Sequence, residues 1–121
     1  MKNNESKSEG YDYFDVTADI GFHAYGKSLN EAYENAGLAM FNVITDISKV
    51  KKDESREFEI VSEDLVSLLY DYLEELLFLQ DTEFLFFSDF KVNIEKIVDD
   101  ESSNLENYKL TCFACGEEAV F

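Results

Sequence analysis

The chain alternates between segments in which apolar residues recur every three or four positions and segments in which they recur every second position. The first helical segment carries apolar side chains at Leu29, Ala32, Tyr33, Ala36, Met40, Val43 and Ile44. Ser28, with Glu31 three positions later, has the form of a capping box. We therefore expect a helix that begins after Ser28.

A second helical segment has the most regular pattern in the chain. Its apolar residues recur at intervals of three, four and seven, at Leu65, Leu68, Leu69, Tyr72, Leu76 and Leu79. Leu73, Leu77 and Phe78 widen this apolar face, so we expect a sheet to cover the helix. Glu74 and Glu75 should stay in solvent.

The segment before this helix, REFEIVS, predicts a strand in which Phe58 and Ile60 face the same way. Ser62 can cap the helix that follows. Glu63 and Asp64 then lie where the helix dipole favours negative charge. We expect the change from strand to helix at this point.

Period-two segments frame the two helices. An early strand is expected to end at Gly26. One side of this strand would carry Ile20, Phe22 and Ala24, and the other would carry Asp19, Gly21, His23 and Tyr25. Later, FLFF (84–87) is expected to be a buried central strand. FKVNIEKIV (90–98) and YKLTCFAC (108–115) alternate on either side of a polar turn, DDESSN (99–104).

The order of these elements predicts an α+β fold. We expect a single-domain, two-layer sandwich in which two helices pack on one face of a mostly antiparallel sheet. Residues 1–10 are expected to form a flexible polar tail, and residues 11–121 the folded domain. Contacts are expected from Leu69, Tyr72 and Leu76 to Ile20, Phe22 and Ile94.

Composition narrows the function classes. Asp and Glu number 27 against 10 Lys and Arg, which gives a formal net charge of −17. The electrostatic field of this negative charge repels phosphate backbones and anionic lipids, so we expect no direct nucleic-acid binding and no membrane binding. The polar N-terminus has no signal-like apolar segment, and no run of about 20 uncharged apolar residues follows. We expect a cytoplasmic protein that folds, since 45% of its residues are hydrophobic.

Familiar catalytic spacings are absent: there is no glycine-rich phosphate loop, no GxSxG elbow and no HExxH. His23 is the only histidine and lies in the middle of a predicted strand, which favours a half-exposed strand residue over a general base. Cys112 and Cys115 form a CxxC motif, but strand residues three apart point to opposite faces. We expect two small, buried or half-buried thiols rather than a metal site.

Asp19 is the carboxylate of most interest, because the nearby Gly21 lets backbone or ligand approach. The alternative is a strand-end Asp that hydrogen-bonds a turn. Asp19 and His23 would be about 13 Å apart along an extended chain, so they cannot share an ion. A metal at Asp19 would need ligands from a distant segment, and oxygen ligation predicts Ca²⁺ or Mg²⁺.

Three stretches, in this order, resemble the archease family. They are TADIGFHAYGKSLNEAYENAGLAMFNVITD (17–46), SEDLVSLLYDYLEELLFLQDTEFLFF (62–87) and GEE (116–118). The resemblance covers much of residues 11–121 and implies an archease-like α+β domain there.

Archeases are small accessory proteins of the GTP-dependent RNA ligase that joins tRNA halves. The resemblance implies a non-catalytic activator with this tRNA-splicing ligase as its partner, which promotes transfer of GMP to the ligase's histidine and repeated turnover. In the family the Asp of the TAD motif, which matches Asp19, is an ion ligand needed for activation. The family is also discussed as a chaperone-like modulator of tRNA modification enzymes.

The chain departs from the family pattern at two places. Val16 stands where archeases usually carry a histidine. The sequence stops at Phe121, before the family's last segment with its final acidic ligand, so we expect that segment to be missing. The resemblance therefore implies an incomplete ligand set for Ca²⁺ or Mg²⁺ in this chain.

Two other function classes stay open. A metal-dependent phosphohydrolase using Asp19 and neighbouring acids would need a positioned base and a fixed ion, and the sequence offers one convincing ligand. A general protein-binding or chaperone module would be favoured if the run Phe84–Phe87 were exposed, whereas we expect it to be buried.

Overall fold

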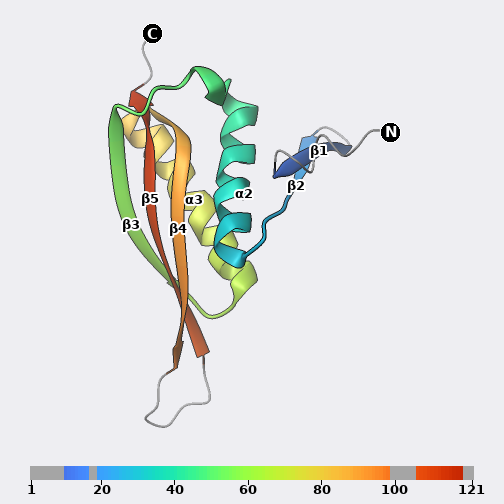
Figure 1. Cartoon of the computed structure of the whole chain (residues 1–121), viewed down its shortest axis with the longest axis vertical. Helices are drawn as coiled ribbons and strands as arrows, with labels where there is room; N and C mark the ends of the chain where they lie inside the picture. The colour runs from blue at the N-terminus through green and yellow to red at the C-terminus, as the bar shows by residue number, and fades with distance from the viewer. Residues whose placement is uncertain (1–9, 17–18, 99–105, 119–121) are drawn as a thin grey trace.

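The computed structural model describes residues 10–16, 19–98 and 106–118, with two helices and two antiparallel sheets (Figure 1). The elements are β1 (Tyr11–Val16), β2 (Asp19–Ala24), α2 (Leu29–Ile44), the 3₁₀ turn η1 (Ile47–Lys49), β3 (Glu54–Ser62), α3 (Leu65–Glu83), β4 (Leu85–Val98) and β5 (Glu106–Glu118). The expected tail, residues 1–10, lies outside the described residues except for Gly10, and so does the polar turn 99–104. In the described part of the chain, neither helix is sufficiently long and apolar to cross a membrane.

The main sheet has the strand order β3-β5-β4, and both of its pairings are antiparallel. Helices α2 and α3 pack on one face of this sheet (Figure 1). The α+β sandwich predicted from the sequence is therefore confirmed.

The core lies between the sheet and the helices. On β5, Cys112 and Ala114 are fully buried while Phe113 between them is exposed, as the alternation of a strand requires. The ring of Phe41 on α2 meets the ring of Phe87 on β4 edge to face, with 5.5 Å between the centroids. Such pairs add to the stabilisation that burial of the rings already provides.

Leu76 on α3 is expected to be a major stabilising residue, because its side chain is fully buried in this core. Leu76→Ala should lower the free energy of unfolding by about 3 kcal/mol, since it leaves a cavity that the neighbours only partly fill. Urea denaturation measures this difference. The control is Val66→Ala, because Val66 lies on the exposed side of the same helix. This substitution should change the free energy of unfolding little. An unchanged urea midpoint for Leu76→Ala would contradict the packing.

The start of α2 follows the prediction. Ser28 caps the helix by accepting a hydrogen bond at Oγ from the backbone N–H of Glu31. The Glu31 carboxylate reaches back to accept from the backbone N–H of Lys27. Gly26 lies between β2 and α2. A Cβ at this position would lie only 2.4 Å from the backbone nitrogen of Ala32, which is too close for a side chain.

The start of α3 does not follow the prediction. Its cap is Asp64, whose Oδ1 accepts a 2.7 Å hydrogen bond from the N–H of Ser67, and not Ser62. Ser62 is still part of β3, where it pairs with Tyr108 on β5 and is therefore extended. Its hydroxyl instead donates a 2.7 Å hydrogen bond to Asp71 on α3.

The FLFF run is also placed differently from the prediction. It opens β4, which is an edge strand, whereas β5 is the central one. Phe84 ends α3 in the left-handed region, with φ 58°, and is exposed. Leu85 and Phe87 are buried as expected, so most of the run belongs to the core rather than to a chaperone-like surface.

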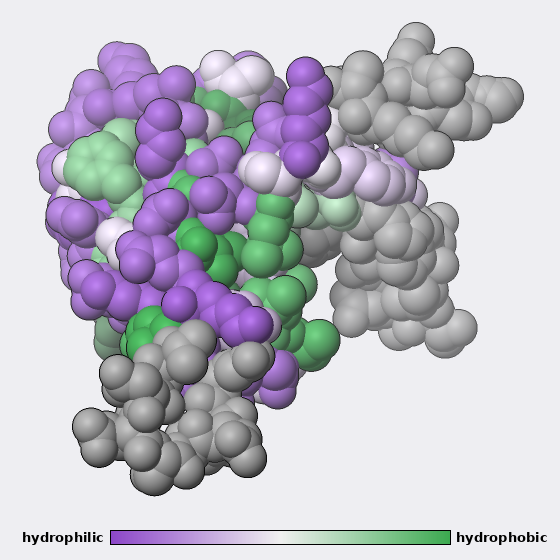
Figure 2. All heavy atoms as spheres, turned by 60° about the horizontal axis from the view of Figure 1, so that its bottom comes forward, coloured by the Kyte–Doolittle hydropathy of each residue, from purple (hydrophilic) through white to green (hydrophobic). Residues whose placement is uncertain are grey.

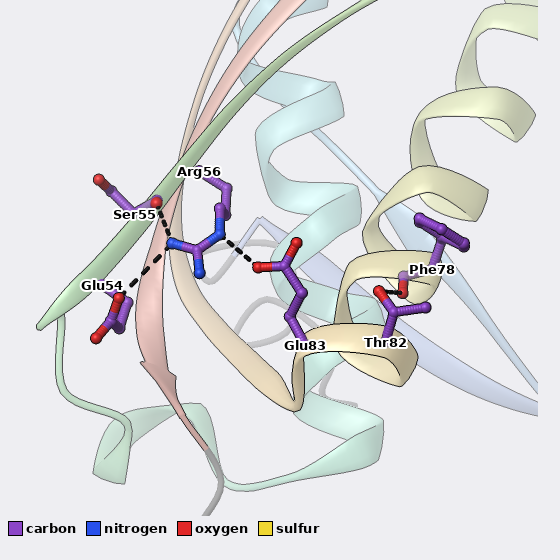
Figure 3. Close-up of polar contacts among 6 residues, drawn as sticks. All are labelled: Glu54, Ser55, Arg56, Phe78, Thr82 and Glu83. Carbon is purple, nitrogen blue, oxygen red and sulfur yellow. Dashed lines mark hydrogen bonds and ion pairs between the residues drawn. The ribbon is translucent and has the colours of Figure 1, made fainter.

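A polar cluster fixes the C-terminal end of α3 to β3 (Figure 3). The Nε of Arg56 on β3 donates a 2.6 Å hydrogen bond to Glu83 on the last turn of α3. The same guanidinium lies 3.6 Å from a carboxylate oxygen of Glu54 and donates to the carbonyl of Ser55. The hydrogen bond to Glu83 raises the pKa of Arg56, whose guanidinium stays charged across the physiological range.

The widened apolar face of α3 is not covered as predicted. Leu73 is half-buried, but Leu77 and Phe78 are exposed, because only one side of the helix meets the sheet. Glu74 is exposed as expected, and Glu75 is half-buried. An apolar strip therefore remains on the outside of α3.

The N-terminal strands form a separate two-stranded sheet that packs on α2 (Figure 1). Strand β1 pairs with β2 from Tyr11↔Ala24 to Val16↔Asp19. The sequence predicts a single strand packed under α3 in place of this hairpin. Tyr72 and Leu76 are buried, and Leu69 and Ile94 are packed against the core, as predicted. Their other predicted partners, Ile20 and Phe22, belong to β2, which contacts α2, and their side chains lie outside the described part.

Candidate functional site

Asp19 is the first residue of β2, where the β1–β2 hairpin turns back. Its backbone is paired with Val16, the position at which the sequence departs from the family pattern. His23 lies towards the other end of the hairpin, opposite Asp12. Asp19 and His23 therefore lie near opposite ends of β2.

Side chains hold the hairpin against α2. The Tyr13 hydroxyl donates a 2.7 Å hydrogen bond to the carbonyl of Ala39, and the Asn35 amide donates a 2.6 Å bond to the carbonyl of Tyr25. Within the hairpin, the Tyr25 hydroxyl donates to Asp12, which raises the pKa of Tyr25. Because a two-stranded hairpin is marginally stable alone, these bonds to α2 give the strand of Asp19 its fixed place.

The described residues do not by themselves provide a complete metal site. Nowhere among them do three His, Cys, Asp or Glu side chains come together in a group that could hold an ion. Calcium takes six to eight oxygen ligands, so one carboxylate leaves most positions to be supplied from elsewhere. The Asp19 side chain lies outside the described part, and its role as a ligand stays a prediction.

The two cysteines are placed as predicted. Cys112 is fully buried, Cys115 is half-buried, and both are free thiols. Burial raises the pKa of Cys112 to about 12, with a smaller contribution from the charge of Glu34. The Cys112 thiol therefore stays protonated at neutral pH, which makes it a poor nucleophile and a poor metal ligand.

The GEE motif closes the main sheet. Gly116 pairs with Phe87 on β4, and Glu118 pairs with Leu85. A carboxylate oxygen of Glu117 accepts a 2.8 Å hydrogen bond from the backbone N–H of Lys51. The motif therefore has a structural role in the described part of the chain.

Two residues that the sequence did not single out protect the outer edge of β4. Glu34 accepts a 2.8 Å hydrogen bond from the backbone N–H of Val92, and Asn30 accepts a 2.9 Å bond from that of Ile94. Asn30 and Glu34 are four residues apart, so they lie on one face of α2. By occupying these donors, α2 blocks strand addition at this part of the edge.

Tyr72 carries a buried hydroxyl without a hydrogen-bond partner in the described structure. The hydroxyl points to Gly37 on α2, where a Cβ would lie only 2.7 Å from it. Burial raises the pKa of Tyr72 well above its usual value, so this hydroxyl stays neutral. A glycine inside a helix costs about 1 kcal/mol relative to alanine, and this packing explains why one is found at position 37.

Tyr72→Phe is expected to raise the free energy of unfolding by about 1 kcal/mol, because it removes a desolvated polar group that has no partner. The matched control is Tyr33→Phe, which removes a hydroxyl that donates to the carbonyl of Leu65. This control should lower stability by about 1 kcal/mol. Chemical denaturation of both variants measures the contrast. Equal losses would show that the Tyr72 hydroxyl is satisfied in solution.

A hollow of about 550 Å³ lies beside the hairpin, between Tyr11 and the end of α2. Its polar side chains already serve the local fold. Asp46 accepts hydrogen bonds from Ser48 as the cap of η1, which lowers the pKa of Asp46. Ser88 donates to the carbonyl of Val50. These groups do not converge on a ligand, so the hairpin with Asp19 stays the candidate site.

The comparison with protein families gives one extended match. A model described as the archease protein family matches residues 11–120. This span includes the hairpin, both helices and all three strands of the main sheet.

Individual relatives agree with this match. The chain is 56% identical over 110 residues to protein archease of Methanothermobacter thermautotrophicus, with 91% of this chain and 74% of the relative covered. It is 47% identical over 108 residues to protein archease of Pyrococcus abyssi, with coverage of 89% and 71%. The solution structure of Methanobacterium thermoautotrophicum protein 1598 is similar, with a TM-score of 0.73, 50% identity and coverage of 93% of this chain and 75% of that one.

Proposed function

This chain belongs to the archease family, and from that membership we propose that it is an accessory activator of the GTP-dependent RNA ligase that joins tRNA halves. In this proposal the chain promotes transfer of GMP to the ligase's histidine and so sustains repeated turnover in tRNA splicing. The ligase performs the chemistry, and this chain is not an enzyme. The observation that carries the proposal is the family match over residues 11–120.

Asp19 is the residue that we assign to activation. It lies at the turn of a hairpin that hydrogen bonds from Tyr13 and Asn35 hold on α2. We propose that its carboxylate supplies one ligand to Ca²⁺ or Mg²⁺, the ions that prefer oxygen donors. The other ligands would come from the ligase or from residues outside the described ones. When bound, the ion would bring positive charge to the phosphates of GTP.

The charge of the chain supports a protein partner rather than direct RNA binding. A net charge of −17 repels tRNA but favours approach to the basic, RNA-binding surface of a ligase. Electrostatic complementarity of this kind mainly raises the association rate. Binding should therefore weaken steeply as the salt concentration rises.

The test is RNA joining by the purified ligase at fixed Mg²⁺, with and without this chain. We expect several products per ligase molecule with the chain, and about one or fewer without it. Equal turnover in both reactions would contradict the proposal. The chain alone, incubated with GTP and RNA, is the control for the phosphohydrolase alternative, and hydrolysis there would favour an enzyme.

A further inference from the structure

Helices α2 and α3 leave an apolar groove open to solvent. The groove has a volume of about 300 Å³ and is lined by Met40, Tyr70, Leu73, Glu74 and Leu77. Tyr70 and Leu77 are 71% and 42% exposed. In the space-filling view, patches of hydrophobic surface (green) lie exposed between hydrophilic areas (purple) (Figure 2).

Four apolar residues on the outer side of α3 form a stripe along the helix. Val66, Tyr70, Leu73 and Leu77 follow one another at spacings of four, three and four, which places them on a single face. Val66 is 78% exposed and extends the stripe past the groove. The stripe is about 16 Å long, which corresponds to three turns of a helix. On α2, Met40 is followed by Ile44 one turn later, and the Ile44 side chain is exposed.

Acidic residues lie beside this apolar surface. Neither α2 nor α3 contains a lysine or an arginine. On α3, Glu74 and Asp81 each follow a residue of the stripe, Tyr70 and Leu77, by one helical turn. Glu74 lies in the groove wall, so a partner in the groove meets negative charge directly.

This charge selects among the molecules that could cover the groove. A second copy of the chain would bring another net charge of −17 against the same field. An anionic membrane would be repelled in the same way. A peptide with apolar and basic residues, in contrast, gains from both the groove and its acidic surroundings.

We propose that the groove between α2 and α3 binds an amphipathic helix of a protein partner, with apolar residues in the groove and Lys or Arg along its flanks. This is the helix-in-groove mode of recognition, in which anchors at positions i, i+3 or i+4 and i+7 enter an apolar channel. The inference goes beyond the proposed activation, because it concerns a second surface that does not include Asp19. Its test involves no ligase, so the two proposals can fail separately.

The first test uses a synthetic probe. A fluorescein-labelled 18-residue peptide carries leucines at helical spacing and lysines elsewhere, and its binding to the full chain is followed by fluorescence anisotropy at 150 mM salt. We expect it to bind at least tenfold more tightly than a scrambled peptide of the same composition. A version with Glu in place of Lys should not bind. Equal affinity of the scrambled peptide would reduce the interaction to non-specific attraction and overturn the proposal.

The second test determines whether the peptide binds in the groove. Tyr70→Lys and Leu77→Lys should each weaken binding of the amphipathic peptide at least tenfold. Val61→Lys is the matched control, because Val61 is an apolar residue that is 57% exposed on β3 and is replaced by the same charge. Circular dichroism checks that all three variants fold. An equal loss for Val61→Lys would show that added positive charge alone weakens binding, and would contradict the assignment of the groove.

Two further measurements test whether a second copy of the chain or a lipid surface covers the groove instead. Sedimentation of the chain alone should give a monomer, and a dimer that Tyr70→Lys dissociates would assign the groove to a second copy instead. Vesicles of phosphatidylcholine should leave the chain in the supernatant. Co-sedimentation that Leu77→Lys abolishes would assign the groove to a lipid surface and overturn the proposal.

Discussion

Asp19→Asn is expected to reduce activation of the RNA ligase about 100-fold or more, with the fold unchanged. Asparagine keeps the size of the side chain and removes its negative charge, so the hairpin pairing of position 19 with Val16 is preserved. Loss of even an indirect supporting group at a metal site typically costs 10–100-fold, and Asp19 is proposed as a direct ligand. The measurement is the number of RNA products per ligase molecule over time.

A second asparagine variant separates the role of Asp19 from general charge loss. Asp53→Asn removes the same charge from an exposed residue in the loop before β3. It should activate the ligase as well as the unaltered chain does. If Asp19→Asn also activates normally, while circular dichroism shows a folded protein, Asp19 is not an ion ligand and this part of the account is wrong.

Of the substitutions proposed for this chain, Gly116→Ala is expected to lower the free energy of unfolding most. A Cβ at this position would lie 1.9 Å from the carbonyl oxygen of Phe86 and 2.7 Å from the Cα of Phe87. Both are backbone atoms of β4, so no side-chain rotation relieves the contact and the two strands must separate. The pairing of Gly116 lies beside an irregularity in β4 between Phe87 and Asp89. We expect a loss of about 3 kcal/mol or more, a large part of the stability of a small domain.

Cys115→Ala is the control for this prediction, because Cys115 precedes the glycine and its side chain is half-buried. Its urea midpoint should stay close to that of the unaltered chain, whereas that of Gly116→Ala should fall clearly. An unchanged midpoint for Gly116→Ala would show that β4 and β5 are farther apart at this point. The result also bears on the GEE motif, whose glycine we interpret as a requirement of strand packing.

The helices could be predicted closely from the sequence because their signals are local. The spacing of apolar residues and the capping box at Ser28 depend on neighbours within one or two turns. The predicted cap of α3 differs from the observed one by two residues, because both Ser62 and Asp64 are good caps. Only the pairing of Ser62 with Tyr108 on β5 shows that the strand continues through this position.

Strand arrangement was harder to predict, because an edge strand and a central strand can share the same apolar pattern. The FLFF run therefore predicts a central strand, although β4 is at the edge of the sheet. The sequence predicts one strand instead of a hairpin here, because no Asn-Gly or Asp-Gly pair marks a turn between Val16 and Asp19. Which apolar residues of α3 stay exposed depends on how the helix is rotated on the sheet. This rotation is a tertiary property that the local sequence pattern does not define.

The candidate site could be predicted only in part. Asp19 was identified through its neighbours and the family resemblance, but the groups that hold its hairpin come from α2. Asn30 and Glu34 were not identified, because their partners Val92 and Ile94 are about 60 positions away along the chain. Contacts at such separation depend on strand register, which the sequence pattern does not define.

Helix α2 connects the parts of this account. It holds the hairpin of Asp19 through Asn35, protects the edge of β4 through Glu34, and lines the apolar groove through Met40. The two proposed surfaces therefore share one rigid element. A partner bound in the groove would lie on the same helix that positions Asp19.

The most direct test of the central claim is guanylylation of the ligase's histidine. Purified ligase is incubated with radiolabelled GTP and Mg²⁺, and the label on the ligase is measured without the chain, with a substoichiometric amount of it, and with Asp19→Asn. We expect label to accumulate beyond the amount of added chain with the unaltered protein, and to stay at the ligase-only level with the variant. Equal labelling in all three reactions would contradict the account.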